Sequence, residues 1–256
     1  MLAALFSSLI IGACALSVKN EPTKMEPFDI LKLTQSWPPA VCIFIEKEEK
    51  KCNISSEVKS WVVHGLWPTK QGTEGPNFCN DTWKFDVTKV EALRPKLDYN
   101  WPSITFDEKP EDTWKHEWEK HGTCGTSLPA LKDEFNYFNT TLGLHYHFDL
   151  QNDRTYQPED VLTILKDGLG VYPSITCVEE KGTKTFYIEQ VELCLDKTFQ
   201  PVNCDKTRST PHQLPATKQG NSLLFQSEKF LGGFQLQDYL IDCPKSGVYY
   251  KPLPSK

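Results

Sequence analysis

Alternation of apolar and polar side chains predicts three β-strands. Residues 28–36 alternate in part, and residues 58–63 form a second short stretch of this kind. Residues 186–195 alternate more regularly, with a change of phase that predicts a bulge near Gln190. The strands are separated by long segments, so their connections are expected to contain helices.

Apolar residues recurring every three to four positions predict three helices. They cover residues 87–97, where Pro95 is expected to disturb the end, and residues 131–142. The third covers residues 158–169, with Pro158 at its start and glycines at its end. Because strands and helices do not alternate regularly, the expected class is α+β rather than a doubly wound α/β sheet.

Two short segments contain three of the chain's six histidines, interleaved with aromatic residues. Residues 61–68 read Trp-Val-Val-His-Gly-Leu-Trp-Pro, and residues 114–124 read Trp-Lys-His-Glu-Trp-Glu-Lys-His-Gly-Thr-Cys. In the first segment Gly65 permits a bend and Pro68 interrupts strand pairing. His64 is therefore expected where the strand of residues 58–63 gives way to a turn.

The second segment predicts a helix that starts near Trp114. Asp112 or Thr113 is the expected cap, because short polar side chains accept hydrogen bonds from the first turn. Gly122 is the expected end of the helix, and Cys124 can fix that end covalently.

Helical geometry places the charged residues of this segment on one face. At about 100° per residue, His116, Glu117, Lys120 and His121 fall within roughly 140° of one another. Glu119 falls away from them and is expected in solvent. The alternative is an ordinary solvated face with a salt bridge.

Two histidines with a Glu and a Lys provide what metal-free phosphoryl transfer requires. One imidazole accepts a proton, the other donates one, and charged groups stabilise the phosphorane between them. A zinc-protease site needs histidines at i and i+4, but His116 is followed by Lys120 at i+4 and by His121 at i+5. Neither a metal nor a cofactor is therefore expected.

Residues 1–17 are predicted to be a signal peptide. Residues 2–16 carry no charge, and Ala13 and Ala15 offer a small-residue cleavage site. The run is shorter than the roughly 20 apolar residues of a membrane helix, and no later stretch is apolar enough to be one. The alternative is a buried N-terminal strand or helix. Residues 18–256 are expected to form a single domain that begins with a loose segment over residues 17–27.

Cysteines and glycosylation motifs agree with export. Of nine cysteines, Cys14 lies in the predicted leader, and the remaining eight are an even number with no Cys-x-x-Cys pair. Four disulfides are therefore expected, with the pairing left open. Asn-x-Ser/Thr motifs at Asn53, Asn80 and Asn139 predict a glycoprotein.

The formal net charge of −6 argues against a general nucleic-acid binder, which is normally basic. It does not exclude an enzyme that holds one phosphate locally. Protonation of all six histidines near pH 5 would bring the sum close to zero and reduce repulsion of a polyanion.

The two histidine segments resemble the conserved blocks of the ribonuclease T2 family, the secreted and lysosomal acid ribonucleases. His-Gly-Leu-Trp-Pro and His-Glu-Trp-x-Lys-His-Gly-Thr-Cys both occur unbroken and in order, and Trp37-Pro38 before Cys42 extends the likeness. The resemblance implies an α+β fold with a central antiparallel sheet flanked by helices. It also implies disulfides Cys42–Cys52, Cys79–Cys124, Cys177–Cys243 and Cys194–Cys204.

The resemblance assigns roles residue by residue. His64, Glu117 and His121 match the catalytic groups, and His116 and Lys120 match residues that hold the phosphate. The implied reaction is endonucleolytic cleavage of single-stranded RNA through a 2′,3′-cyclic phosphate, with His121 as base, His64 as acid and an acidic optimum. DNA lacks the 2′-hydroxyl and cannot react in this way.

Recognition of the base is expected to involve Trp67 and Thr69. Trp67 matches an aromatic residue that lines the family's base pocket. Position 69 is often Asp or Asn in the family, and the Thr69 hydroxyl can form a hydrogen bond but cannot act as a carboxylate. Low base specificity is therefore expected.

The remaining histidines, His145, His147 and His212, are expected on the surface or in packing, and Trp61, Trp114 and Trp118 in the core. The rival interpretation is a secreted signalling or binding glycoprotein whose ribonuclease activity is incidental or vestigial. Against it, every polar site residue is present. RNA is the expected partner, a monomer the expected state, and secretion or lysosomal retention the expected location.

Overall fold

The computed structural model describes residues 28–73, 75–204 and 239–254. The predicted signal peptide over residues 1–17, the expected loose segment over residues 17–27 and His212 all lie outside these residues.

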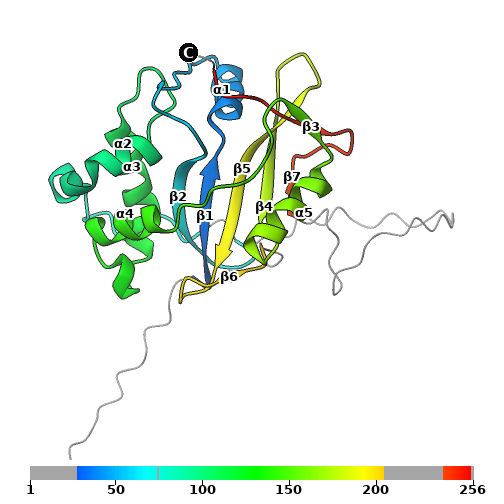
Figure 1. Cartoon of the computed structure of the whole chain (residues 1–256). Coiled ribbons are helices and arrows are strands. Elements are labelled where there is room, and N and C mark those ends of the chain that lie inside the picture. Colours follow the sequence, from blue (N-terminus) through cyan, green and yellow to red (C-terminus); the bar gives the residue numbers. More distant parts are fainter. Residues whose placement is uncertain (1–27, 74, 205–238, 255–256) are drawn as a thin grey trace, which may run out of the picture.

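A mixed, mostly antiparallel sheet runs through the middle of the molecule (Figure 1). Its main path has the order β2-β1-β5-β4-β7, and β2 is an edge strand. The pairs β4/β7 and β5/β8 are parallel, whereas the other pairs are antiparallel. The strands are β1 (Ile30–Ser36), β2 (Val62–Thr69), β3 (Arg154–Tyr156), β4 (Ser174–Glu179), β5 (Phe186–Leu195), β6 (Pro201–Val202), β7 (Leu240–Ile241) and β8 (Val248–Tyr250).

Helices flank the sheet. Those named α2, α3 and α4 gather beside β2, α5 lies near β4, and α1 lies at one end of the sheet (Figure 1). The α-helices are α1 (Pro38–Lys47), α2 (Arg94–Asn100), α3 (Pro110–Lys120), α4 (Glu134–Gly143) and α5 (Pro158–Leu169). The 3₁₀ helices are η1 (Val87–Leu93), η2 (Gly122–Cys124) and η3 (Pro129–Leu131). The predicted α+β class is therefore confirmed, with two parallel pairings where an antiparallel sheet was expected.

Alternation along β1 divides its side chains between two apolar clusters. Leu31 and Leu33 pack with the helices beside β2, whereas Ile30 packs with α1 and α5. Trp114 and Trp118 belong to the first cluster and Trp61 to the second, and all three are at most 3% exposed. The prediction that these tryptophans pack the core is confirmed.

The most regular patterns gave correct bounds. The strand over residues 186–195 and the helix over residues 158–169 both match, and Gly170 follows that helix with a φ of 78°. The single helix expected over residues 87–97 is wrong, because it divides into η1 and α2. Pro95 lies in the first turn of α2, where its missing N–H costs no intrahelical bond.

The turn expected at His64 is also wrong. The strand does not end there, since β2 begins at Val62 and continues through Pro68 to Thr69. Gly65 pairs with Thr34 and Val63 pairs with Gln35, which leaves His64 as the extra residue of a β-bulge. Pro68 is tolerated because β2 is an edge strand.

The bulge predicted near Gln190 is confirmed. Gln190 pairs with Thr176 and Ile188 pairs with Cys177, so Glu189 is the extra residue in β5.

All four disulfides implied by the resemblance are present: Cys42–Cys52, Cys79–Cys124, Cys177–Cys243 and Cys194–Cys204. The Cys79–Cys124 bond joins η2, directly after α3, to the segment that follows β2. Within the described ranges, every helix is too short or too polar to cross a bilayer.

Candidate active site

Helix α3 carries most of the candidate site, and its predicted start was wrong. It begins at Pro110 rather than near Trp114, and the residue before it is Lys109. Asp112 takes part in the cap from inside the first turn, where its carboxylate accepts from the Lys109 backbone N–H at 3.1 Å. The helix ends at Lys120 with His121 as its C-cap, so Gly122 directly follows the cap, as expected, and opens η2.

The face predicted from helical phasing extends from the interior to the surface. Glu117 is 1% exposed and His121 is 7% exposed, whereas Lys120 is half-buried and His116 is exposed. The prediction that Glu119 lies in solvent is wrong. It is half-buried, and its carboxylate accepts from the Phe85 backbone N–H at 3.3 Å.

The Glu117 carboxyl group joins α3 to β2. Trp67 Nε1 donates to Glu117 Oε2 at 2.8 Å, and Glu117 Oε1 lies 3.8 Å from His64 Nε2. A Cβ at Gly65 would lie 2.1 Å from Glu117 Oε2 and 2.3 Å from Trp67 Nε1. Gly65 is therefore required for the close approach of helix and strand, and not for the turn expected from the sequence.

The Trp67 ring contacts both His64, whose side chain is 39% exposed, and His121, which is buried. Its ring centroid lies 5.1 Å from that of His64 in an edge-on arrangement, and 5.1 Å from that of His121 in a stacked one. The His116 ring lies 6.5 Å from the His121 ring, toward the surface. The structure thus brings together His64, Trp67, Glu117 and His121, with His116 at the margin.

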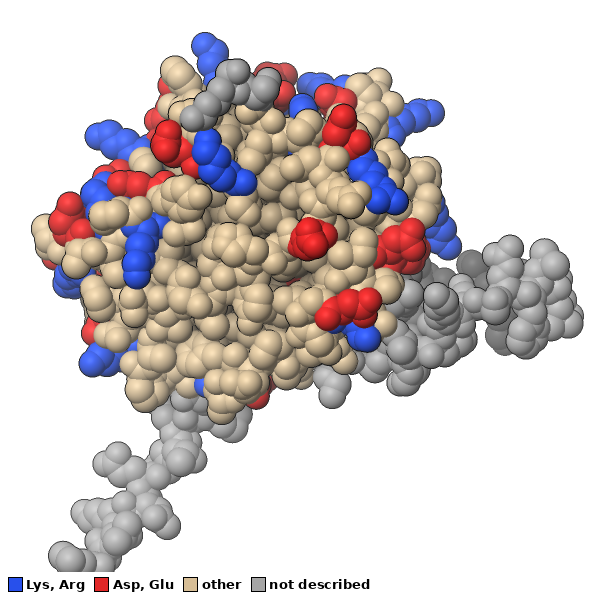
Figure 2. Space-filling view, in the orientation of Figure 1, with Lys and Arg blue, Asp and Glu red and all other residues tan. Residues whose placement is uncertain are grey.

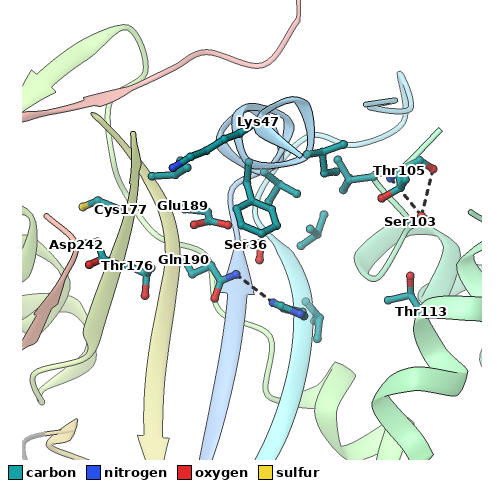
Figure 3. Close-up of a pocket in the computed structure, with 18 of the residues that line it drawn as sticks. Ser36, Lys47, Ser103, Thr105, Thr113, Thr176, Cys177, Glu189, Gln190 and Asp242 are labelled. Carbon is teal, nitrogen blue, oxygen red and sulfur yellow. Dashed lines mark hydrogen bonds between the residues drawn. The ribbon is translucent and has the colours of Figure 1, made fainter. Parts of the chain in front are cut away.

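Gln190 is a site residue that sequence reasoning did not identify. Its side-chain Nε2 lies 3.2 Å from His64 Nδ1, and both side chains line a cavity of about 760 Å³ beside the site (Figure 3). An amide N–H in this position donates to Nδ1 of a neutral imidazole. The predicted bulge near Gln190 was the available signal, since bulges often redirect side chains next to active sites.

Thr69 is placed differently from the other predicted residues. It is buried at the end of β2, and its hydroxyl donates to the Trp67 carbonyl at 3.0 Å. Its hydroxyl proton is therefore used within its own strand.

Burial controls the electrostatics of the site. Desolvation, followed by the charges of His116 and Lys120, lowers the pKa of His64 to about 4. Desolvation, Lys120, His116 and His64 in that order lower the pKa of His121 to about 3. Burial also lowers the pKa of His116, with a smaller contribution from Lys120.

Glu117 shifts in the opposite sense, because burial disfavours its charged form. Desolvation raises its pKa to about 8, although the hydrogen bond from Trp67 and the charge of Lys120 oppose the shift. Near neutral pH the free site therefore holds two uncharged imidazoles beside a mostly protonated carboxyl group. Such a set can give and take protons without a large buried charge.

Charged residues of both signs lie around the rim of one face of the molecule, and its centre is largely uncharged (Figure 2). In the part of the chain that the structure describes, no three His, Cys, Asp or Glu residues are grouped to hold a metal ion.

The predicted glycosylation positions Asn53 and Asn139 are exposed, and Asn80 is half-buried with Oδ1 accepting from Thr82. His145 Nε2 contacts the Trp61 carbonyl at 2.9 Å, and His147 is exposed.

The sequence is similar to a known protein family and to ribonucleases of other organisms. The sequence model described as "Ribonuclease T2 family" matches residues 28–204. Ribonuclease Oy of Magallana gigas is 38% identical over 185 residues, which cover 67% of this chain and 85% of that protein.

Solved structures agree. Ribonuclease MC1 from bitter gourd seeds superposes with a TM-score of 0.61 at 30% identity, covering 69% of this chain and 94% of that one. A mutant of RNase MC1 in complex with 5′-GMP also has a TM-score of 0.61, at 29% identity, with the same coverage of both chains.

Proposed function

The chain belongs to the ribonuclease T2 family and is a ribonuclease of the T2 type, and we propose that it cleaves single-stranded RNA by metal-independent transesterification. The observation that carries this proposal is that two imidazoles, those of His64 and His121, each lie 5.1 Å from the Trp67 ring. They come from different elements, β2 and the end of α3, so that a phosphate between them meets one on each side.

In the proposed reaction His121 removes the proton from the 2′-hydroxyl, and its oxygen attacks the adjacent phosphorus. His64 donates a proton to the leaving 5′-oxygen, so the products are a 2′,3′-cyclic phosphate and a free 5′-hydroxyl. Water then opens the ring with the two roles reversed. In the protonated His64 both ring nitrogens carry hydrogen, so the Gln190 amide presents its oxygen to Nδ1–H, holds the ring, and leaves Nε2 to give the proton.

Glu117 stabilises the pentacovalent intermediate as a neutral acid. A carboxylate would repel the negative phosphorane, whereas a carboxyl group whose pKa is raised to about 8 can donate an O–H to a non-bridging oxygen. Lys120 adds positive charge at the same place, and His116 contacts a non-bridging oxygen from the surface side.

This arrangement favours activity in acid. The reaction needs one protonated histidine and one neutral one, and burial lowers the pKa of His64 to about 4 and that of His121 to about 3. The singly protonated pair is therefore most populated well below neutral pH. A bound phosphate raises both pKa values through its negative charge and moves the optimum upward.

Low base specificity is part of the proposal. Trp67 offers a ring edge to a base, but its N–H is committed to Glu117. Thr69 supplies only the remaining lone pairs of a hydroxyl that already donates to the strand.

We place the enzyme in the secretory pathway, either secreted or in lysosomes. Four disulfides favour an oxidising compartment. Residues 1–17 then act as a signal peptide, residues 18–256 form one catalytic domain, and Asn53, Asn80 and Asn139 are glycosylation sites. A monomer without metal or cofactor suffices for this chemistry.

The test is cleavage of total RNA by wild type, His64→Phe and His121→Phe at pH 5 and pH 7, with circular dichroism to check folding. Each variant should lose cleavage at least a thousandfold while remaining folded, and excess EDTA should leave the wild type unaffected. Cleavage near the wild-type rate in either variant would refute the mechanism. A folded wild type that cleaves no RNA would favour the signalling or binding glycoprotein.

A further inference from the structure

The cavity beside His64 continues past Gln190 to a second polar region that the proposed mechanism does not use. It is built by α1, by β4 and β5, and by the segment directly after β7 (Figure 3). We name this region the acidic end of the cavity; its polar lining is Lys47, Thr176, Glu179, Glu189 and Asp242.

A β-bulge builds this region. Neighbouring residues in a regular strand point to opposite faces of the sheet. Because Glu189 is the extra residue of the bulge in β5, it and Gln190 both line the cavity. Trp37 N–H donates to the Glu189 carbonyl at 2.8 Å, which ties the bulge to the start of α1. The irregularity that aims Gln190 at His64 therefore also aims Glu189 at the acidic end.

Glu189 is buried without a partner. The residue is 8% exposed, and across residues 28–73, 75–204 and 239–254 its carboxyl group has no hydrogen bond or ion pair. Burial, and next the negative charge of Asp242, raises its pKa to about 7, whereas Lys47 opposes the shift. Glu179 on β4 is the remaining charged residue in this lining. The Glu189 oxygens are not sealed in the interior but face the cavity, so a ligand in the cavity can supply the hydrogen-bond partner that the protein does not.

The charge and hydrogen-bonding groups of the acidic end limit the classes of ligand that it can bind. Three carboxyl groups against one lysine make the acidic end unsuited to a phosphate. A metal ion is also disfavoured, because no three metal-binding side chains come together among the described residues. A protonated carboxyl group offers a donor beside an acceptor, which matches the hydrogen-bonding edge of any of the four RNA bases. Phe44, which is 47% exposed, and Phe186 add apolar walls to the cavity.

The distance of the acidic end from His64 across the sheet indicates which nucleotide of a bound RNA would reach it. His64 on β2 protonates the leaving 5′-oxygen in the proposed mechanism, so RNA downstream of the cleaved bond extends into this cavity. Along the order β2-β1-β5-β4-β7, β5 lies two strands and β7 four strands from β2. At about 4.8 Å per strand the acidic end lies roughly 10 to 19 Å from the axis of β2. That separation suits the nucleotide after the leaving one.

We propose that the acidic end is a nucleobase subsite for the second nucleotide downstream of the cleaved bond, and that the Glu189 carboxyl group hydrogen-bonds the edge of that base. This proposal rests on the proposed ribonuclease function and adds a residue that contacts substrate without taking part in the chemistry. It also gives a physical reason for tolerance of all four bases at this position in acid.

Three substrates test the proposal in the full chain at pH 5. They are a dinucleotide, the same dinucleotide extended by one downstream nucleotide, and the extended form with an abasic downstream sugar. With two hydrogen bonds to the base, the extended substrate should have a kcat/KM about tenfold higher than the dinucleotide. The abasic form should gain little.

Three variants test whether the Glu189 side chain causes the higher kcat/KM of the extended substrate. Glu189→Leu should remove the tenfold gain and leave cleavage of the dinucleotide unchanged. Glu189→Gln retains a donor beside an acceptor and should retain the gain. Glu179→Gln is the matched control, since it removes one negative charge from the same lining at an exposed position and should also retain the gain.

The pH dependence of this gain in kcat/KM, measured on the wild type with each downstream base, is a further test. Above pH 7 the Glu189 carboxylate can only accept, so the gain should fall for adenine, cytosine and uracil and persist for guanine, which offers two neighbouring N–H donors.

Equal kcat/KM for the natural and abasic trinucleotides, or a full gain in Glu189→Leu, would overturn the subsite while leaving the ribonuclease function intact. Failure to cleave any of the three substrates would instead overturn the function itself. In that case a trinucleotide with a 2′-deoxy group at the scissile position still tests the subsite, because tighter binding than its abasic form is expected.

Discussion

The protonated carboxyl group in the site should cost the enzyme stability, and Glu117→Gln should recover it. Glu117 is 1% exposed, and its pKa is raised from an ordinary 4.5 to about 8 by burial. Unfolding releases the carboxyl group into water, where it ionises above pH 4.5. The unfolded chain therefore holds fewer protons than the folded one between pH 4.5 and pH 8, and the free energy of unfolding falls as pH rises through this window.

The magnitude follows from the two pKa values. Each pH unit in the window costs about 1.4 kcal/mol, so the loss at pH 7 is about 3 kcal/mol. Glutamine does not titrate, has nearly the same shape, and can still accept from Trp67 Nε1. The Glu117→Gln protein should therefore match the wild type near pH 4.5 and be more stable by about 3 kcal/mol at pH 7, while its RNA cleavage falls.

Urea unfolding of both proteins at half-unit steps from pH 4.5 to pH 8 measures this difference. Glu111→Gln is the control on the same helix, because Glu111 binds Arg94 at 2.7 Å and its pKa is lowered by hydrogen bonds to its carboxylate. Its removal should cost stability at pH 7 and cost less in acid, which is the opposite trend. A stability difference between Glu117→Gln and wild type that does not change with pH would refute the reasoning.

Three further predictions concern the scaffold of the site. Gln190→Leu should lower kcat about tenfold with little change in KM, whereas Gln190→Glu should raise the pKa of His64, the general acid, and shift the alkaline limb of the kcat profile to higher pH. Gly65→Ala places a Cβ 2.1 Å from Glu117 Oε2, so it should lose about 1 to 3 kcal/mol in thermal unfolding and most of the activity. Replacing Cys79 and Cys124 by Ala removes a cross-link of sequence separation 45 and should cost about 4 kcal/mol in the chain-entropy model, as measured by urea unfolding.

Sequence reasoning succeeded where one periodicity persisted over a whole element. Helix α5 and strand β5 have regular apolar spacing and clear breakers, and their predicted bounds match the structure. Helix α1 was not predicted, although two prolines after Trp37 are typical of a first helical turn. Strand β4 was also missed, because a run of six residues is too short for its pattern to distinguish a strand from a loop.

The sequence predicted which residues make up the candidate site, but not which of them are buried. Helical phasing correctly grouped Glu117 with His121, but it did not predict how far either is buried. Both are buried, whereas His116 is exposed. Which residues on a face become buried depends on what packs against it, here the backbone of Gly65 in a distant strand. The pKa shifts follow from that burial and were not accessible from local sequence.

Two β-bulges position the site, and only one of them was predicted from the alternation of the sequence. Both lie beside the end of β1, where Thr34 and Gln35 bracket the bulge at His64 and Ser36 pairs with Gln190. Without the extra residue, the side chains that follow each bulge would point to the opposite face of the sheet. The bulge at His64 lies in the β1/β2 ladder and the bulge at Glu189 lies in the β4/β5 ladder, whereas the β1/β5 ladder is regular. His64 and Gln190, on the two neighbours of β1, meet at 3.2 Å. Substrate-facing chemistry in this fold therefore depends on two local departures from strand periodicity: the change of phase near Gln190 can be read in the sequence, whereas the bulge at His64 was mistaken for a turn.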